Sequence, residues 1–447
     1  GQFSYYVVKA LLELQKVWSL TSVNICYLMT DFTSSNVDYW KQHPSLRPFV
    51  ESGVLDFAVF DLEKDNYIKL INQNVTLSKN SLLTPLIAVG NYLFDSVLID
   101  LFHIKDNSIK EQLVEVSLPE GMLGEKVISE KQWEDVKLIY STRDIADNYY
   151  QDAVLDKMLH DYKSSLKDTL LRFPIAGIRC LQNLSALSHG KLVLLSSDKG
   201  YVSQAELDYD DEPPELTSHG SFSLMVNYHA LEQYFRLNDG WSFMQEPVDA
   251  CFTTCVFGMG VDLATMPNFS RTMNDLFSHY CPSHYHHLYE HFCDTIEDAS
   301  LESIASMLAF SHWDPSIFDI SSDRISDLTE DEDTDEDVKD YLANNLMKVV
   351  ENFYFLPGAD DVLFSGAVFY QETHDYEQAI SLYLRSLELF GENYAVYFNL
   401  GYCHFELKEY DKALILFQKS NFYVRENADK IELNNYIARA KEYGVAG

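Results

Sequence analysis

Basic residues are scarce in this chain of 447 residues. Only 33 lysines and arginines stand against 69 aspartates and glutamates, which gives a formal net charge of −36. Clustered basic side chains carry the affinity of proteins for nucleic-acid phosphates and for anionic lipid surfaces. The charge therefore argues against a nucleic acid or an anionic membrane as partner, and it leaves neutral and cationic partners open.

Cysteines and long apolar runs are also scarce. Seven cysteines are too few for a disulfide scaffold, and an odd number leaves at least one unpaired, which indicates a reducing compartment. No run approaches the roughly 18 apolar residues of a membrane span. The first residues do not have the pattern of a secretory signal. Because the sequence begins with Gly1 and not with methionine, the possibility of a leader segment upstream stays open. We expect a cytoplasmic protein of two or three domains.

The first half alternates short apolar runs with helical patterns. Apolar runs predict strands at 23–29, 55–60, 86–89, 191–195 and 222–226. Helical spacing of apolar residues predicts helices at 2–16, 36–51 and 148–171. Strands separated by helices favour an α/β domain with a mostly parallel sheet.

The first three predicted strands end in polar or small residues, namely Asp31, Asp61 and Gly90-Asn91. Ligands of open α/β sheets bind outside the carboxyl ends of the strands, so these endings predict a site. An aspartate after a strand is also a good helix cap or turn residue. The structural alternative therefore stays open for Asp31 and Asp61 individually.

The second half is predicted to be helical. A helical extension rich in His, Tyr and Phe is expected at 251–328, followed by an acidic linker at 329–338. Within the segment 339–447, two copies of a pattern repeat with a period of 34 residues, as in the pairs Ala367 and Gly401, and Tyr383 and Phe417. A helix-turn-helix repeat of this length is the tetratricopeptide signature. We therefore expect an all-α repeat domain with flanking helices, in which 429–443 forms a cap.

The concave groove of these repeats is predicted to be aromatic. The expected groove positions include Phe364 in the first copy and Phe398, Tyr402 and Phe405 in the second. An aromatic groove suits an apolar segment of a protein partner. The alternative is that the groove docks on helices of this chain, such as 339–355.

A group of cysteines and histidines invites a zinc interpretation, since His287 and His291 lie four residues apart on a predicted helix. The flanking cysteines, at 251, 255, 281 and 293, do not have C-x-x-C spacing. A packed surface of aromatic and histidine side chains is the favoured interpretation, and no metal is predicted.

Residues 1–250 resemble a class I S-adenosylmethionine-dependent methyltransferase that begins within its first motif. Gly1 resembles the last glycine of the family's glycine-rich turn, and Asp31 the acid that binds the ribose of the cofactor. Asp61 resembles the acid near the adenine. The segment Gly90-Asn91-Tyr92-Leu93-Phe94-Asp95 resembles the motif that faces the methyl group. The resemblance implies S-adenosylmethionine as cofactor, with Gly90 and Asn91 as further cofactor-binding residues.

This last motif most resembles the branch related to arginine methyltransferases of the mitochondrial complex I assembly type, which carries N-E-x-x-D. Tyr92 stands where that branch has glutamate, so the carboxylate that would hold a guanidinium is replaced. By motif position, Tyr92 and Asp95 are the catalytic candidates.

The resemblance also implies a Rossmann-like sheet whose first, central strand is missing, with a helical insertion at about 103–185. The strands at 23–29 and 86–89 would then flank an empty slot. We expect either that the chain is part of a longer protein or that another segment fills the slot. The predicted function is methyl transfer to a protein, with the repeats recruiting a partner or substrate. The alternative is a non-catalytic interaction scaffold with a degenerate methyltransferase fold.

Overall fold

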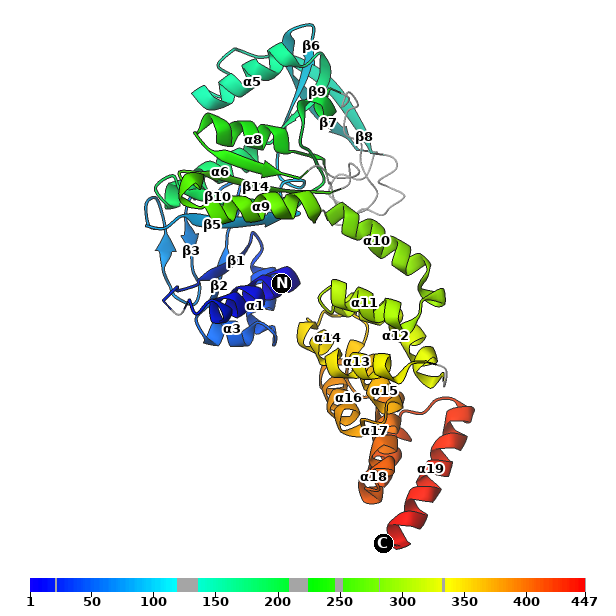
Figure 1. Cartoon of the computed structure of the whole chain (residues 1–447). Coiled ribbons are helices and arrows are strands. Elements are labelled where there is room, and N and C mark those ends of the chain that lie inside the picture. The colour runs from blue at the N-terminus through cyan, green and yellow to red at the C-terminus, as the bar shows by residue number, and fades with distance from the viewer. Residues whose placement is uncertain are drawn as a thin grey trace. The chain divides into compact units, whose positions relative to one another are not determined.

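A computed structural model describes residues 1–20, 22–118, 136–208, 224–245, 252–280, 282–331 and 334–446. The chain divides into two compact units (Figure 1), which are considered separately. The helical unit comprises Gly1–Leu20 and Glu290–Gly447, and the α/β unit comprises Thr21–Tyr289.

The α/β unit contains mixed sheets. In a two-stranded sheet, β1 (Tyr27–Asp31) pairs in parallel with β2 (Leu55–Val59). A four-stranded sheet has the order β13-β14-β10-β5, formed by Trp241–Met244, Thr253–Met259, Leu192–Asp198 and Leu86–Asn91. β5 and β10 are parallel, whereas β14 is antiparallel to both of its neighbours.

Among the described residues, β1 pairs only with β2, and β5 pairs only with β10. The strands predicted at 23–29 and 86–89 are therefore not paired with each other. Each of the two strands therefore keeps one edge that is not part of a ladder.

The core of the α/β unit lies around β10 and β14 and is rich in large aromatic side chains. Phe102, Phe173, Phe235 and Phe257 are fully buried, and they belong to the same cluster as Leu192 and Leu194 of β10. Helix α6 (Ile175–Leu187) packs on β5, and α8 (Tyr228–Leu237) packs on β13 and β14. This packing fixes β5 and β10, whose carboxyl ends border the site described below.

The segment predicted as a helical insertion is largely a β-structure. A four-stranded antiparallel sheet has the order β8-β7-β6-β9, formed by Lys137–Asp144, Ser108–Ser117, Asp100–Lys105 and Asp168–Phe173. Within the described part of this segment, the helices are α5 (Ala153–Ser165) and α6. The prediction was wrong because β6 and β9 are only six residues long, and β6 pairs with β9 about 70 positions away in the sequence.

Two further expectations are corrected. The helical extension was predicted to start at 251, but β14 occupies Thr253–Met259 and is buried almost throughout. The predicted strand at 222–226 is reduced to β12 (Val226–Asn227), which pairs with β11 (Gly200–Tyr201), while 222 and 223 lie outside the described residues.

The remaining elements of the α/β unit are short or peripheral. The helix predicted at 36–51 is two helices, α2 (Ser34–Gln42) and α3 (Arg47–Glu51), because Pro44 follows the end of α2. The remaining elements also include β3 (Ile68–Lys69), β4 (Thr76–Leu77), α7 (Gln204–Leu207) and α9 (Pro267–His279). Helix α10 (Pro282–Asp294) contains the boundary between the two units.

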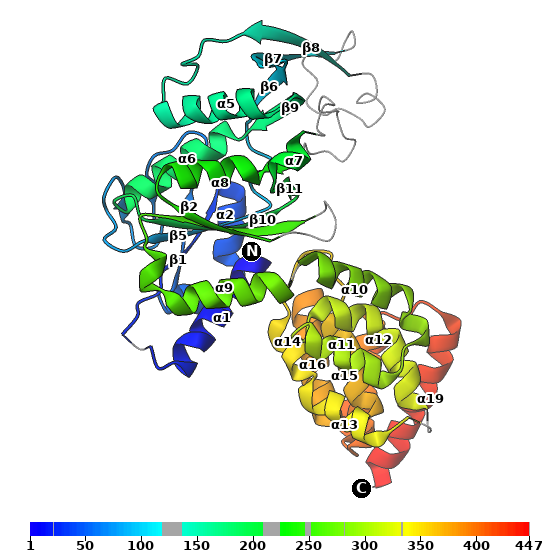
Figure 2. The same ribbon diagram turned by 45° about the horizontal axis from the view of Figure 1, so that its top comes forward.

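The helical unit contains the predicted repeats (Figure 2). The first copy is α15 (Val362–Glu372) with α16 (Tyr376–Phe390), and the second is α17 (Tyr394–Glu406) with α18 (Tyr410–Ser420). The repeat pattern has a small residue at Gly401, where helices α17 and α18 pack closely. A Cβ atom at this position would lie only 2.6 Å from the ring of Phe417. The helices that flank the repeats are α11 (Leu301–Phe310), α12 (Pro315–Glu330), α13 (Glu336–Asn345), α14 (Met347–Asn352) and α19 (Asn427–Ala446).

The N-terminal helix α1 (Gln2–Val17) belongs to the helical unit, although the sequence predicts it at the start of the α/β domain. Tyr5 donates a hydrogen bond of 2.7 Å to the carbonyl oxygen of Glu351, and Lys9 Nζ donates one of 2.8 Å to Asn352 Oδ1. The side chain of Val8 is fully buried. Within the described ranges, none of the helices combines the length and apolar character needed to cross a bilayer.

Candidate functional site

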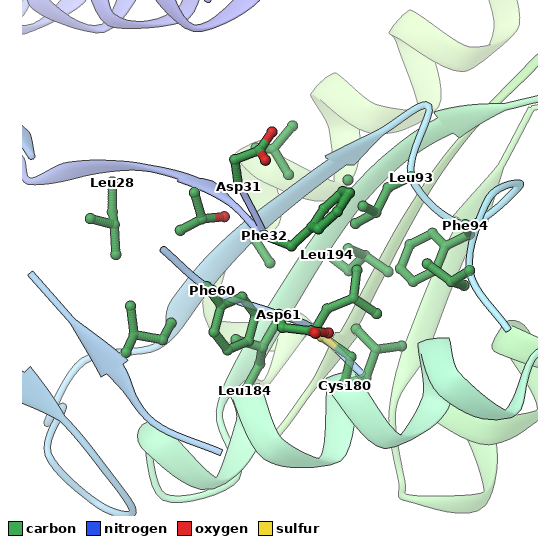
Figure 3. A pocket seen from close by; sticks show the side chains of 18 of the residues that line it. Leu28, Asp31, Phe32, Phe60, Asp61, Leu93, Phe94, Cys180, Leu184 and Leu194 are labelled. Atoms are coloured by element: carbon green, nitrogen blue, oxygen red, sulfur yellow. The ribbon is translucent and has the colours of Figure 1, made fainter. Parts of the chain in front are cut away.

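A cavity of about 660 Å³ runs between β1 and β5 in the α/β unit (Figure 3). Three residues predicted from strand endings line it, namely Asp31, Asp61 and Gly90, together with Tyr92, which was predicted from the methyltransferase resemblance. Asn91 and Asp95 belong to the same segment as Gly90 but are not among its lining residues. Gly1 belongs to the helical unit and is not among the residues that line this cavity.

The carboxylate of Asp31 holds the turn that leads from β1 into α2. Its Oδ1 accepts hydrogen bonds from the backbone N–H and the hydroxyl of Thr33, at 2.7 and 2.6 Å, and its Oδ2 accepts one of 2.9 Å from Asn36 Nδ2. Partial burial acts to raise the pKa of Asp31, but these hydrogen bonds outweigh it and hold the pKa below its ordinary value. Asp31 is therefore ionised at neutral pH, and Oδ2 retains a lone pair for a further donor.

Asp61 has a similar local role after β2. Its Oδ2 lies 2.6 Å from Lys64 Nζ, and its Oδ1 accepts a hydrogen bond of 3.0 Å from the backbone N–H of Glu63. The hydrogen bond from Lys64 is the main reason that the pKa of Asp61 is lowered. Asp31 and Asp61 thus both stabilise the turns that follow their strands, by accepting hydrogen bonds from residues two positions later in the chain.

The loop after β5 has an unusual backbone. Tyr92 has φ of 49°, a left-handed conformation that a bulky side chain adopts rarely. Its ring is largely exposed and lies 5.3 Å from the ring of Phe252. At Gly90, a Cβ atom would lie 3.2 Å from both Leu93 and Phe94, so a small residue suits this position.

Asp198, which ends β10 beside this loop, was not predicted from the sequence as a site residue. Its side chain is fully buried, and its Oδ1 accepts a hydrogen bond of 2.9 Å from the N–H of Lys199. Burial, followed by the negative charge of Asp95, raises the pKa of Asp198 to about 6. The rule that selected Asp31 and Asp61 would also have selected Asp198, because it too follows a predicted strand. Carboxyl groups with a strongly shifted pKa are common at functional sites.

The wall of the cavity is apolar. Phe60, Leu28 and Ile68 line it together with Leu184 of α6, and Figure 3 shows Phe60 and Leu184 near each other. Cys180 of α6 also lines it, and burial raises the pKa of this thiol to about 12, so it is protonated and unreactive at neutral pH. The cavity therefore pairs an apolar wall with carboxylates at its rim.

The predicted groove residues of the repeats are packed within the helical unit. The ring of Tyr436 on α19 lies 5.5 Å from Phe398 and 5.8 Å from both Tyr402 and Phe405. Phe364 in the first copy lies 5.6 Å from Tyr383. These contacts favour the interpretation that the groove docks on this chain, but the helix is α19 and not the segment 339–355.

The histidines of the zinc interpretation lie on α10. Among the residues that the structure describes, no group of three or more His, Cys, Asp or Glu side chains is arranged to hold a metal ion. Cys251 and Cys281 lie outside the described residues.

Comparison with known families gives one match. Residues 366–420 match the tetratricopeptide repeat family, over a span that begins within α15 and ends with α18. The curated proteins contain no match to the sequence. The chain thus carries tetratricopeptide repeats, which commonly mediate protein interactions through the surfaces of their stacked helices.

Proposed function

We propose that the α/β unit binds S-adenosylmethionine in the cavity between β1 and β5 and transfers its methyl group to a protein. The helical unit would recruit that protein. The observation that carries the proposal is the convergence of Asp31, Asp61, Gly90 and Tyr92, from three different segments, on one cavity.

The chemistry of the cavity fits the cofactor. A volume of about 660 Å³ lies within the range of pockets that hold small molecules. The apolar wall around Phe60 suits an adenine ring, and the ionised Asp31 suits the ribose hydroxyls, because a carboxylate accepts strong hydrogen bonds. Among the described residues, β1 and β5 belong to separate sheets, so the cavity between them is not closed by a direct pairing of the two strands.

In methyl transfer, the main task of the protein is to position the methyl donor and the acceptor. When bound, S-adenosylmethionine supplies a methyl group on a positively charged sulfur, which makes it electrophilic. The chain must hold donor and acceptor in register and exclude water. Asp31 would anchor the cofactor, Tyr92 would position the acceptor at the exposed side of the loop, and Asp95 with Asp198 would fix that loop.

The second candidate is a protein-interaction scaffold whose α/β unit carries no chemistry. The match to tetratricopeptide repeats favours an interaction role whether or not the α/β unit is an enzyme. Binding of the cofactor separates the two candidates, because a scaffold with a degenerate site has no need to bind it.

Replacing Asp31 by alanine is expected to weaken the binding of S-adenosylhomocysteine by more than tenfold. The loss of a charge-assisted hydrogen bond costs about 1.5–3 kcal/mol. Asp31→Asn should weaken binding similarly while it keeps an acceptor for Thr33. Asp38→Asn, on the exposed surface of α2, is the matched control, and calorimetry is the measurement. Unchanged affinity in both Asp31 variants would remove Asp31 from the site.

A further inference from the structure

The two walls of the cavity belong to different sheets. One wall comes from β1 and the segment that follows β2, and the other comes from β5 and β10. Helix α6 forms the floor, to which it contributes Cys180 and Leu184 (Figure 3). Because no ladder joins β1 to β5 among the described residues, the separation of the two walls depends on other contacts.

Apolar packing holds the walls together near the start of β5. Ala58 of β2 and Leu187 of α6 are buried in one small cluster, and Leu86, the first residue of β5, packs against it. The N–H of Leu82 donates a hydrogen bond of 2.9 Å to the carbonyl oxygen of Leu187. This end of the cavity is therefore closed and fixed to α6.

The opposite end, where the strands terminate, forms the mouth of the cavity, and a hydrogen bond spans it. The backbone N–H of Leu98 donates a bond of 2.9 Å to Oε1 of Glu63. Glu63 lines the wall that follows β2, whereas Ser96 and Val97, just before Leu98, line the wall that follows β5. The carbonyl oxygen of Leu98 accepts a bond of 3.3 Å from the N–H of Ala176 in the first turn of α6. Glu63 thus ties one wall to a segment that α6 anchors.

The loop that carries Glu63 is held in shape by its own hydrogen bonds. Oδ1 of Asp61 accepts a bond from the N–H of Glu63, and the N–H of Asp61 donates one of 2.8 Å to Oδ2 of Asp65. At the base of the loop, Asn183 of α6 donates a bond of 3.4 Å to the carbonyl oxygen of Asp65. Glu63 itself is exposed, so its bond to Leu98 can open without the loss of buried packing.

We propose that Glu63 is a latch, whose hydrogen bond to Leu98 closes the mouth of the cavity over a bound nucleoside and whose release opens it. The inference rests on the proposed function, because the nucleoside is the cofactor of that proposal. The floor at α6 and the apolar cluster around Leu187 act as the hinge. A latch of this kind sets the rates at which the ligand enters and leaves.

The hydrogen bond is tested first in the 447-residue chain without any nucleoside. In Glu63→Ala the amide hydrogen of Leu98 should exchange at least tenfold faster than in the wild type, because its acceptor is removed. Glu63→Gln keeps an oxygen acceptor and should restore most of the protection. Glu51→Ala, which removes an exposed carboxylate at the end of α3, is the matched control and should leave the exchange unchanged. Equal exchange of Leu98 in wild type and Glu63→Ala would overturn the proposal.

The gating role is tested by the kinetics of S-adenosylhomocysteine binding, measured by surface plasmon resonance. Glu63→Ala should raise both the association and the dissociation rate constants, each at least threefold, because the mouth stays open. Glu63→Gln and Glu51→Ala should stay within twofold of the wild type. A substitution that only damages the site would speed release without speeding association, and that result would also overturn the latch.

The remaining outcomes separate the latch from the proposed function. Equal rate constants in wild type and Glu63→Ala would overturn the latch and leave the cofactor site standing. The absence of binding by the wild type would overturn the proposed function and the latch with it.

Discussion

Replacing Phe405 by alanine is expected to lower the free energy of unfolding of the helical unit by about 3–5 kcal/mol. Phe405 is only 6% exposed and contacts Tyr410, Tyr436 and Tyr443. Removal of its ring would leave a cavity between α17 and α19. Circular dichroism during denaturation with urea measures the effect.

The control for this prediction is Phe422→Ala. Phe422 is 83% exposed, so the same chemical change should alter the free energy of unfolding by less than about 0.5 kcal/mol. If Phe405→Ala were as mild as Phe422→Ala and also abolished binding of a protein partner, α19 would not cover the groove. The aromatic groove would then be a recognition surface, as one of the two interpretations of the sequence holds.

Replacing Asp198 by asparagine is expected to remove a pH dependence of stability. The folded chain holds the pKa of Asp198 near 6, above the value of 3.8 for a free aspartate, so the native state favours the protonated form. The stability linked to that proton is fully present below about pH 4 and is lost as the pH rises through 6. A shift of about two units corresponds to about 3 kcal/mol.

The measurement compares urea denaturation of wild type and Asp198→Asn between pH 4 and pH 7.5. The variant should gain up to about 3 kcal/mol relative to the wild type over this range, because asparagine carries no charge to bury. Asp95→Asn is the second variant, since loss of the neighbouring charge should make the wild-type dependence shallower. A difference between Asp198→Asn and wild type that does not change with pH would show that Asp198 is not the group concerned.

The positions of several strands in the α/β unit could be predicted from the sequence, but the pairing of its strands into sheets could not. The runs at 55–60 and 86–89 are strands, and their endings at Asp61 and Gly90 line the cavity. The sheet β8-β7-β6-β9 was missed because its pairing joins residues up to about 70 positions apart, which no local period encodes. The buried strand β14 was taken for helix, because a short apolar run does not distinguish the two.

The repeats were more predictable, because a period of 34 residues reports long-range packing directly. Even so, two contacts of the helical unit lay beyond the sequence. Tyr5 of α1 reaches Glu351, some 346 residues away, and Tyr436 of α19 covers the groove of the second copy. Neither contact leaves a trace in the repeat, since the partners lie outside it.

The most direct test of the proposed function is a calorimetric titration of the chain with S-adenosylhomocysteine at pH 7.5. The account predicts saturable binding of one molecule per chain, weakened more than tenfold by Asp31→Asn and unaffected by Asp38→Asn. The absence of saturable binding would contradict a cofactor site between β1 and β5, and the interaction scaffold would then be the better account of the protein.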